Sequence, residues 1–213
     1  MDTNITELIF ILDRSGSMAG LEGDTIGGFN SMLKKQKEEP GAARVTTVLF
    51  DNEYEVLHDR LDLAAVKPIT DKAYFVRGST ALLDAIGRTI HKVDGVLEST
   101  ELQYRADKIL FVIITDGMEN ASHAFTREQL AKLVSQRREM GWEFIFLGAN
   151  MDAIAVAQSY GIAQERSRTY RNDPLGVELN FQAVSDAASH YRGSRSIPKD
   201  WDRKIRERGN GNK

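Results

Sequence analysis

The sequence predicts a doubly wound α/β fold, in which helices cover both faces of a mostly parallel, six-stranded sheet. Two apolar runs, 8–12 and 109–114, lack the alternation of a half-exposed strand and therefore indicate strands that are buried on both faces. Segments with helical spacing alternate with the strand-like segments along the chain, which is typical of a parallel sheet. A predicted hairpin over 45–58 adds one antiparallel strand at an edge of the sheet.

The first half of the chain contains three of the predicted strands. Pro40-Gly41 ends the first helix, because proline cannot continue a helix and glycine favours its end. The second helix has a strong amphipathic pattern, with an apolar residue every three or four positions. The predicted elements are a strand over 5–13, a helix over 21–39, strands over 45–50 and 54–58, and a helix from 80 to 97.

The second half repeats the alternation of strand and helix. Thr126 is placed to cap the amino end of a helix, since its hydroxyl can accept a hydrogen bond from a free backbone N–H. The predicted elements are strands over 108–115, 142–147 and 168–171 and helices over 126–140, 152–160 and 175–191. We assign 1–191 to one domain and expect the Arg-, Lys- and Gly-rich tail, 192–213, to pack loosely.

Length and composition exclude several classes of protein. The chain has 213 residues, of which 41% are hydrophobic and 28% charged, as expected of one globular domain with a full core. It has neither an apolar run as long as a membrane span nor the basic start of a secretory signal. The absence of cysteine excludes thiolate metal sites and suits a reducing cytosol, so we expect a cytoplasmic protein. A net charge of -3 gives no reason to expect nucleic acid as a partner.

Oxygen-bearing side chains follow the two buried strands at the points where these strands end. Asp13, Ser15 and Ser17 follow the first strand, Asp116 follows the second, and Thr80 begins a helix. If the two strands are neighbours, the chain reverses its winding direction between them and leaves a crevice at the carboxyl edge of the sheet. Carboxylates and hydroxyls are the ligands of a hard cation such as Mg²⁺, and Mn²⁺ would fit the same set. The sequence therefore predicts a divalent metal site.

Two glycines and two polar residues lie beside these candidate ligands. Gly16 and Gly117 lie at strand ends, where tight turns often need a positive φ, and we expect that conformation here. Glu119 and Asn120 follow Asp116 and would either rim the site or lie in a solvated loop. We therefore leave both out of the predicted ligand set.

The five predicted ligands resemble, in order and spacing, the metal-ion-dependent adhesion site (MIDAS) of von Willebrand factor type A domains. The resemblance implies a Rossmann-like three-layer sandwich. It also implies that Ser15, Ser17 and Thr80 coordinate the ion directly or by turns, whereas Asp13 and Asp116 act mostly through bound waters. In that family an acidic side chain of a partner fills the open coordination position.

The resemblance extends over about residues 5–190 and is greatest to small stand-alone bacterial or phage members. It implies an intracellular, metal-dependent protein-binding module or scaffold, of a phage or of a bacterial stress or defence system. Its expected partner is a protein that presents an acidic side chain, with no role for a membrane. Arg14 and Arg77 flank the motif and either attract that acidic partner or form ordinary surface salt bridges.

The alternative is a Mg²⁺-dependent phosphoryl-transfer enzyme with the layout of haloacid-dehalogenase phosphatases. Such an enzyme needs a second acid two residues after the nucleophilic Asp, and Ser15 occupies that position. The phosphate-binding pattern Gly-x-x-x-x-Gly-Lys-Ser/Thr and the dinucleotide-binding pattern Gly-x-Gly-x-x-Gly after the first strand are both absent from the sequence. We therefore expect that the protein is not an enzyme.

Overall fold

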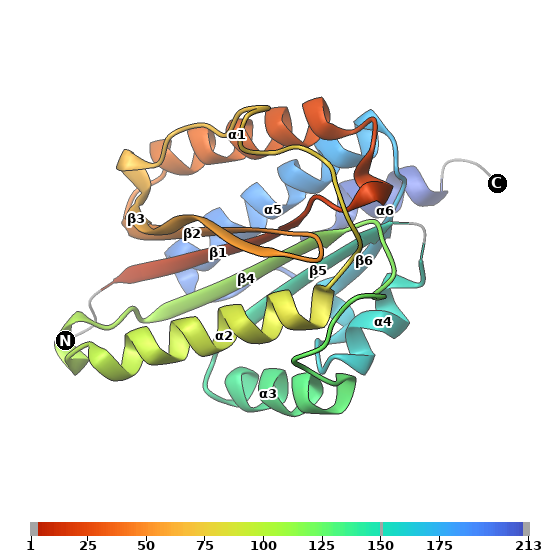
Figure 1. The fold of residues 1–213 in the computed structure, drawn as a ribbon. Helices are drawn as coiled ribbons and strands as arrows, with labels where there is room; N and C mark the ends of the chain where they lie inside the picture. The colour runs from red at the N-terminus through yellow and green to blue at the C-terminus, as the bar shows by residue number, and fades with distance from the viewer. Residues whose placement is uncertain (1–3, 150, 211–213) are drawn as a thin grey trace.

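A computed structural model describes residues 4–149 and 151–210 and contains one six-stranded sheet between layers of helices (Figure 1). The strand order is β3-β2-β1-β4-β5-β6. Only β3 runs antiparallel to its neighbour, so the predicted mostly parallel sheet with one antiparallel edge strand is confirmed. The strands are β1 (Ile5–Asp13), β2 (Ala42–Phe50), β3 (Tyr54–Asp62), β4 (Lys108–Thr115), β5 (Glu143–Ala149) and β6 (Ser167–Tyr170).

Helices cover both faces of this sheet. The helices are α1 (Glu22–Glu38), α2 (Leu82–Ser99), α3 (Arg127–Glu139), α4 (Ala153–Ser159), α5 (Pro174–Ser194) and α6 (Arg203–Asn210). Apolar residues of α1, α5 and α6 share one core with one face of the sheet, and those of α2, α3 and α4 share a second core with the other face. Within the described part of the chain, no helix combines the length and apolarity that crossing a bilayer requires.

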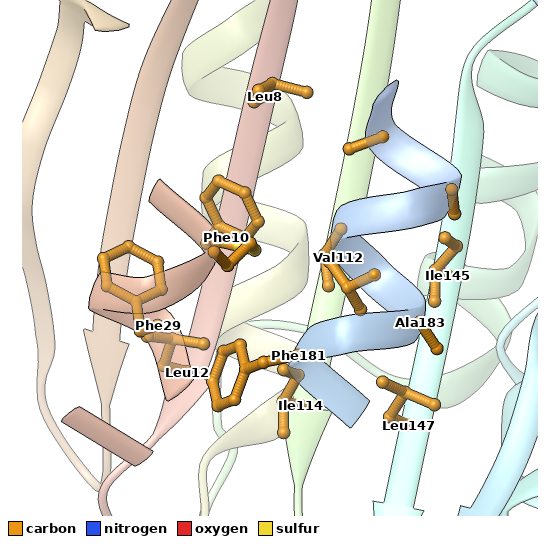
Figure 2. Packing of buried hydrophobic residues seen from close by; sticks show 14 of the residues in the cluster. Leu8, Phe10, Leu12, Phe29, Val112, Ile114, Ile145, Leu147, Phe181 and Ala183 are labelled. Carbon is orange, nitrogen blue, oxygen red and sulfur yellow. The ribbon is translucent and has the colours of Figure 1, made fainter. Parts of the chain in front are cut away.

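The core between α1, α5 and the sheet is closely packed (Figure 2). The ring of Phe29 meets the rings of Phe10 and Phe181 edge to face, with centroids 5.3 and 6.3 Å away. A Cβ at Gly28 would lie 2.3 Å from the Phe181 ring, so the two helices approach closely only because this position is glycine. This packing fixes α1, and with it the loop that joins β1 to α1.

The central strands β1 and β4 are neighbours and run parallel. From β1 the sheet continues to β2 and β3 on one side and through β4 to β5 and β6 on the other, so the chain reverses its winding direction between β1 and β4. The predicted topological switch point is therefore present at the carboxyl ends of these two strands. Asp13 is the last residue of β1, and Asp116 directly follows β4.

The end of the chain differs from the loose tail expected for 192–213. Residues 192–194 complete α5, and the segment that follows returns to the domain as α6. Ile197, Trp201 and Ile205 are buried in the core beside α5, and the Trp201 indole N–H donates to the Glu165 carbonyl at 2.8 Å. These apolar side chains, spaced four residues apart, stabilise 195–210 through burial, whereas 211–213 lie outside the described residues.

Candidate metal centre

Three loops meet at the carboxyl edge of β1 and β4. The β1–α1 loop and the β3–α2 loop are joined by backbone hydrogen bonds from Gly16 N to Gly78 O (3.1 Å) and from Arg77 N to Arg14 O (2.9 Å). The β4–α3 loop is joined to the β3–α2 loop, because Asn120 N donates to Thr80 O at 3.0 Å. The three segments that the sequence singled out are therefore held against one another by their backbones.

The predicted hydroxyl ligands form a continuous chain of close oxygens. Thr80 Oγ1 donates to Ser15 Oγ at 2.9 Å, and Ser15 Oγ lies 3.1 Å from Ser17 Oγ. Ser17 Oγ in turn donates to Asp116 Oδ1 at 2.5 Å. Ser15, Thr80 and Asp116 are buried and Ser17 is exposed, so the chain of oxygens reaches solvent at Ser17.

Gly117 lies opposite these hydroxyls. A Cβ at this position would be 2.7 Å from Thr80 Oγ1, 2.8 Å from Ser17 Oγ and 3.4 Å from Ser15 Oγ, so three oxygens converge on a space that a methyl group would fill. The expectation of a positive φ at Gly16 and Gly117 is wrong, since neither is among the positive-φ glycines. Glycine is required at 117 by the crowding of the hydroxyls.

Asp13 provides a buried carboxylate beside the hydroxyls. Its Oδ1 accepts the backbone N–H of Ser15 at 2.7 Å and its Oδ2 accepts the hydroxyl of Thr115 at 2.5 Å. Burial raises the pKa of Asp13 to about 6, against the opposing effect of these hydrogen bonds and with a smaller contribution from the charge of Asp116. The fold thus holds this carboxylate at an energetic disadvantage when no cation is near.

Asp116 is in a similar position. Burial raises its pKa, although hydrogen bonds from Ser17 and Asn172 act in the opposite direction. Among residues 4–149 and 151–210, no lysine or arginine forms an ion pair with Asp13 or Asp116. Two buried carboxyl groups therefore share a site that the described part of the chain supplies with no positive charge.

The donor set fits a hard divalent cation. Magnesium prefers an oxygen shell that combines one or two carboxylates with waters, and hydroxyls are compatible with it. No group of three or more His, Cys, Asp or Glu side chains that could hold a metal is present among the described residues. The centre has only two acids, and its hydroxyls complete the set, which makes a softer, nitrogen- or sulfur-seeking ion a poor fit.

Asn172 is a member of the centre that the sequence analysis missed. Its Nδ2 donates to Asp116 Oδ2 at 3.0 Å, from the loop between β6 and α5, and its buried Oδ1 has no hydrogen-bond partner among the described residues. The amide therefore orients Asp116 and stabilises its charged form. The signal that could have revealed Asn172 is its place just after the last parallel strand, at the same edge of the sheet.

Glu119 and Asn120 are tethers of the β4–α3 loop. Asn120 Oδ1 accepts the backbone N–H of Thr80 at 2.9 Å, so this side chain fixes the backbone of a predicted ligand. Glu119 accepts the backbone N–H of Leu83 at 3.0 Å, in the first turn of α2, and that of Ser122 at 2.7 Å. The loop is therefore held to the start of α2 at both residues.

Arg14 and Arg77 share one carboxylate partner, Asp51. Arg14 is fully buried and donates from Nε to Asp51 Oδ2 at 2.9 Å, and Arg77 donates to the same oxygen at 2.8 Å. Both expectations for Arg14, attraction of a partner and a surface salt bridge, are wrong, because the side chain is inaccessible. Asp51, which directly follows β2, is the centre of this ion-pair cluster and is itself fully buried.

Solved structures resemble this chain although no protein-family model and no curated protein matches it. Proximal thread matrix protein 1 of the mussel byssus, in a structure with a zinc-occupied MIDAS motif, has a TM-score of 0.59 at 14% identity over 88% of this chain and 47% of that chain. The von Willebrand factor domain of the type V pili tip protein Mfa5 from Porphyromonas gingivalis has 0.62 at 11% identity, over 84% and 93%. Manganese-loaded TRAP protein from Plasmodium vivax has 0.53 at 16% identity, over 70% and 58%.

Fold and site together define an α/β domain with an oxygen-lined centre at the switch point of a mostly parallel sheet. The particular fold is that of the von Willebrand factor type A domain, as the similarity to solved domains of that name shows. The chain spans about half the length of the mussel protein, 47%.

Proposed function

We propose that this protein is a metal-dependent protein-binding module. Its residues Asp13, Ser15, Ser17, Thr80 and Asp116 hold Mg²⁺, for which Mn²⁺ could substitute, and a carboxylate of a partner protein completes the shell. The observation that carries the proposal is the space in front of Gly117. Three hydroxyl oxygens line it beside two buried carboxyls, and no described lysine or arginine pairs with either carboxyl. Structures of the same fold that hold zinc or manganese support it.

The proposed role of these residues is to bind a metal ion and a partner carboxylate, without a chemical reaction of the partner. When bound, the ion supplies an electrophilic centre whose open position can accept an external oxygen. Ser17 is exposed, so the approach to the centre is from solvent on its side. Ser15 occupies the position at which a phosphatase of this layout would need its second acid, and its hydroxyl lies within hydrogen-bond distance of those of Thr80 and Ser17. We therefore propose that the protein is a binding module and not an enzyme.

The proposal also includes the cellular location of the protein. We place the protein in the cytoplasm of a bacterium, as part of an assembly of the host or of a phage. It has no cysteine, and its net charge of -3 does not favour nucleic acid.

Thermal unfolding in Mg²⁺ and in EDTA tests the metal centre. At roughly 100 times its Kd, Mg²⁺ should raise the free energy of unfolding by about 2.7 kcal/mol. Asp116→Ala should lose this increase because a carboxylate is removed. Gly117→Ala should lose it although every ligand is kept, since its Cβ would fill the space between the hydroxyls. The control is Gly27→Ala in α1, where a Cβ would meet nothing within 4 Å, and it should respond as the wild type does.

An affinity pull-down in Mg²⁺ and in EDTA tests partner binding. A protein retained in Mg²⁺, released by EDTA and absent with Asp116→Ala would support the proposal. An equal Mg²⁺ response of wild type and Asp116→Ala in thermal unfolding would falsify the assigned centre.

A further inference from the structure

The exposed apolar side chains of this protein divide between the two edges of the sheet. Among the described residues, seven large hydrophobic side chains are exposed. Those near the amino ends of the parallel strands are Leu61, Leu102, Tyr104 and Met140. Those near the carboxyl ends of the strands are Phe75 and Met118, in loops, and Leu175, in the first turn of α5, which together we call the apolar rim.

Each rim residue lies within three positions, along the sequence, of a residue in the centre or bonded to it. Met118 follows Gly117 directly and is 70% exposed. Phe75 follows Tyr74, whose hydroxyl donates to the Asp13 carbonyl at 2.5 Å. Leu175 lies three residues after Asn172, the amide that holds Asp116. The rim therefore brings apolar surface from three separate segments of the chain to the surroundings of one candidate ion site.

The rim is held in place before any partner arrives. The guanidinium groups of Arg14 and Arg77 lie 5.5 and 5.4 Å from the centre of the Phe75 ring, which fixes this ring although it is 44% exposed. Leu175 is in the first turn of α5, after Pro174 and an Asp173 side chain that caps the helix through Gly176 N at 2.8 Å.

Met118 sits between two fixed points of its loop. On one side Gly117 N donates to Thr115 Oγ1 at 3.3 Å, and on the other Asn120 is bonded to the Thr80 backbone. Ordering costs reduce affinity when mobile side chains are immobilised, so a rim fixed in advance favours binding.

Two partly exposed arginines also lie beside the rim, and each is paired with an acid of this chain. Arg171, 54% exposed beside the start of α5, pairs with Asp173 at 3.5 Å, and Arg77, 38% exposed beside Phe75, pairs with Asp51 at 2.8 Å. A small carboxylate such as acetate could reach the ion but could not contact apolar side chains that come from three segments of the chain.

We propose that the partner segment is a polypeptide in which one Asp or Glu is flanked on both sides by apolar residues. The carboxylate binds at the metal centre, and the flanking side chains pack against Phe75, Met118 and Leu175. This inference rests on the proposed function and adds the specificity of the same site. The carboxylate makes binding depend on the metal, and the rim selects among acidic segments.

A displayed library of linear peptides tests this specificity. Each peptide carries one fixed Asp or Glu with random residues on both sides, and binding to the full chain in Mg²⁺ is followed by elution with EDTA. We expect apolar residues to be enriched beside the fixed acid. Fluorescence polarisation then measures a synthetic copy of the most enriched peptide. We expect the Met118→Ser/Leu175→Ser variant to bind it at least about tenfold more weakly.

The control is Leu102→Ser/Met140→Ser, which removes two apolar side chains, 79% and 66% exposed, from the opposite edge. It should bind within about twofold of wild type, and both variants should keep the Mg²⁺ response in thermal unfolding. Enrichment of polar flanking residues, or equal binding by the two double variants, would overturn the rim while leaving the metal-dependent module intact. Peptides that bind Asp116→Ala as well as wild type, or a library with no EDTA-eluted peptide, would overturn both proposals.

Discussion

Asp13 and Arg14 are adjacent in the chain and both are buried, yet they enter clusters of opposite kind. Around Arg14, the carboxylate of Asp51 receives two guanidinium groups and a backbone N–H from Glu53 at 2.6 Å. Burial acts to raise the pKa of Asp51, but these hydrogen bonds and charges outweigh it and lower the pKa. The fold thus supplies its own counter-charge at this cluster.

The cluster around Asp13 has carboxyl groups and hydroxyls but no described cationic side chain, and burial raises the pKa of both of its acids. A buried carboxylate with an internal cation is a part of the fold, whereas one without such a cation is stable only when protonated or when an external cation binds. The cluster around Arg14 therefore serves the stability of the fold, whereas the cluster around Asp13 is suited to bind an external cation.

The largest expected effect comes from breaking the internally paired cluster. Asp51→Ala removes one of the two carboxylates that pair with the fully buried Arg14, the other being that of Glu55 at 2.7 Å, and should lower the free energy of unfolding by about 3 to 5 kcal/mol. Denaturant unfolding in EDTA measures this change. The matched control is Glu53→Ala, which removes only the exposed end of the cluster and should cost less than about 1 kcal/mol. Equal losses in the two variants would contradict the comparison.

Neutralising an acid of the metal centre should change the free energy of unfolding in the opposite direction. Because the folded pKa of Asp13, about 6, exceeds its ordinary value of 3.8, stability in EDTA is lost as the pH rises between these values. Asp13→Asn should therefore stabilise the protein in EDTA by about 1 to 3 kcal/mol at pH 7.5 and by little at pH 4. It should also remove the Mg²⁺ response. Unfolding curves at the two pH values check the sign, and a loss of stability at pH 7.5 would refute this reading.

Magnesium affinity should depend on pH for the same reason. Protons compete with the ion for Asp13, so Mg²⁺ binding should weaken as the pH falls through about 6, by about tenfold per unit below it. Titration calorimetry between pH 5 and 8 measures this slope. An affinity that stays constant across this range would mean that the buried carboxyl does not take part.

The smallest effect is expected at the residue that orients Asp116. Asn172→Ala removes an amide that stabilises the charged carboxylate and should weaken Mg²⁺ binding by about tenfold. The adjacent Arg171→Ala changes an exposed side chain and should leave Mg²⁺ affinity within about twofold of wild type. Indistinguishable affinities of the two variants would exclude the proposed role of Asn172.

The sequence allowed the sheet and the positions of the predicted ligands to be inferred because both depend on local pattern. Buried strands are visible as unbroken apolar runs, and each run leads directly to Asp13 or Asp116. Asn172 was missed although a strand was predicted over 168–171, because its bond to Asp116 exists only once β6 has joined the sheet, and no local pattern contains that contact. The Asp51 cluster was missed because it joins β1 to a turn after β2, and that contact exists only once the strands pair.

The end of the chain shows a different limit of sequence reasoning. Ile197, Trp201 and Ile205 have helical spacing, but charged residues and glycines around them suggest a solvated tail. Their burial depends on the surface that α5 and the end of the sheet present, which no local pattern contains. The loose tail was therefore inferred from composition where tertiary packing decides.

The space in front of Gly117 also has an evolutionary consequence. Every glycine codon becomes an alanine codon through one base substitution, and the methyl group so added would occupy the place where the hydroxyls converge. A lineage could therefore lose metal binding in one mutational step while the sheet persists, and regain it by reversion. Among proteins of this fold, shared ancestry alone is therefore a poor guide to which of them bind a partner through a metal ion. The residue that follows the second aspartate, Gly117 in this chain, is a better guide.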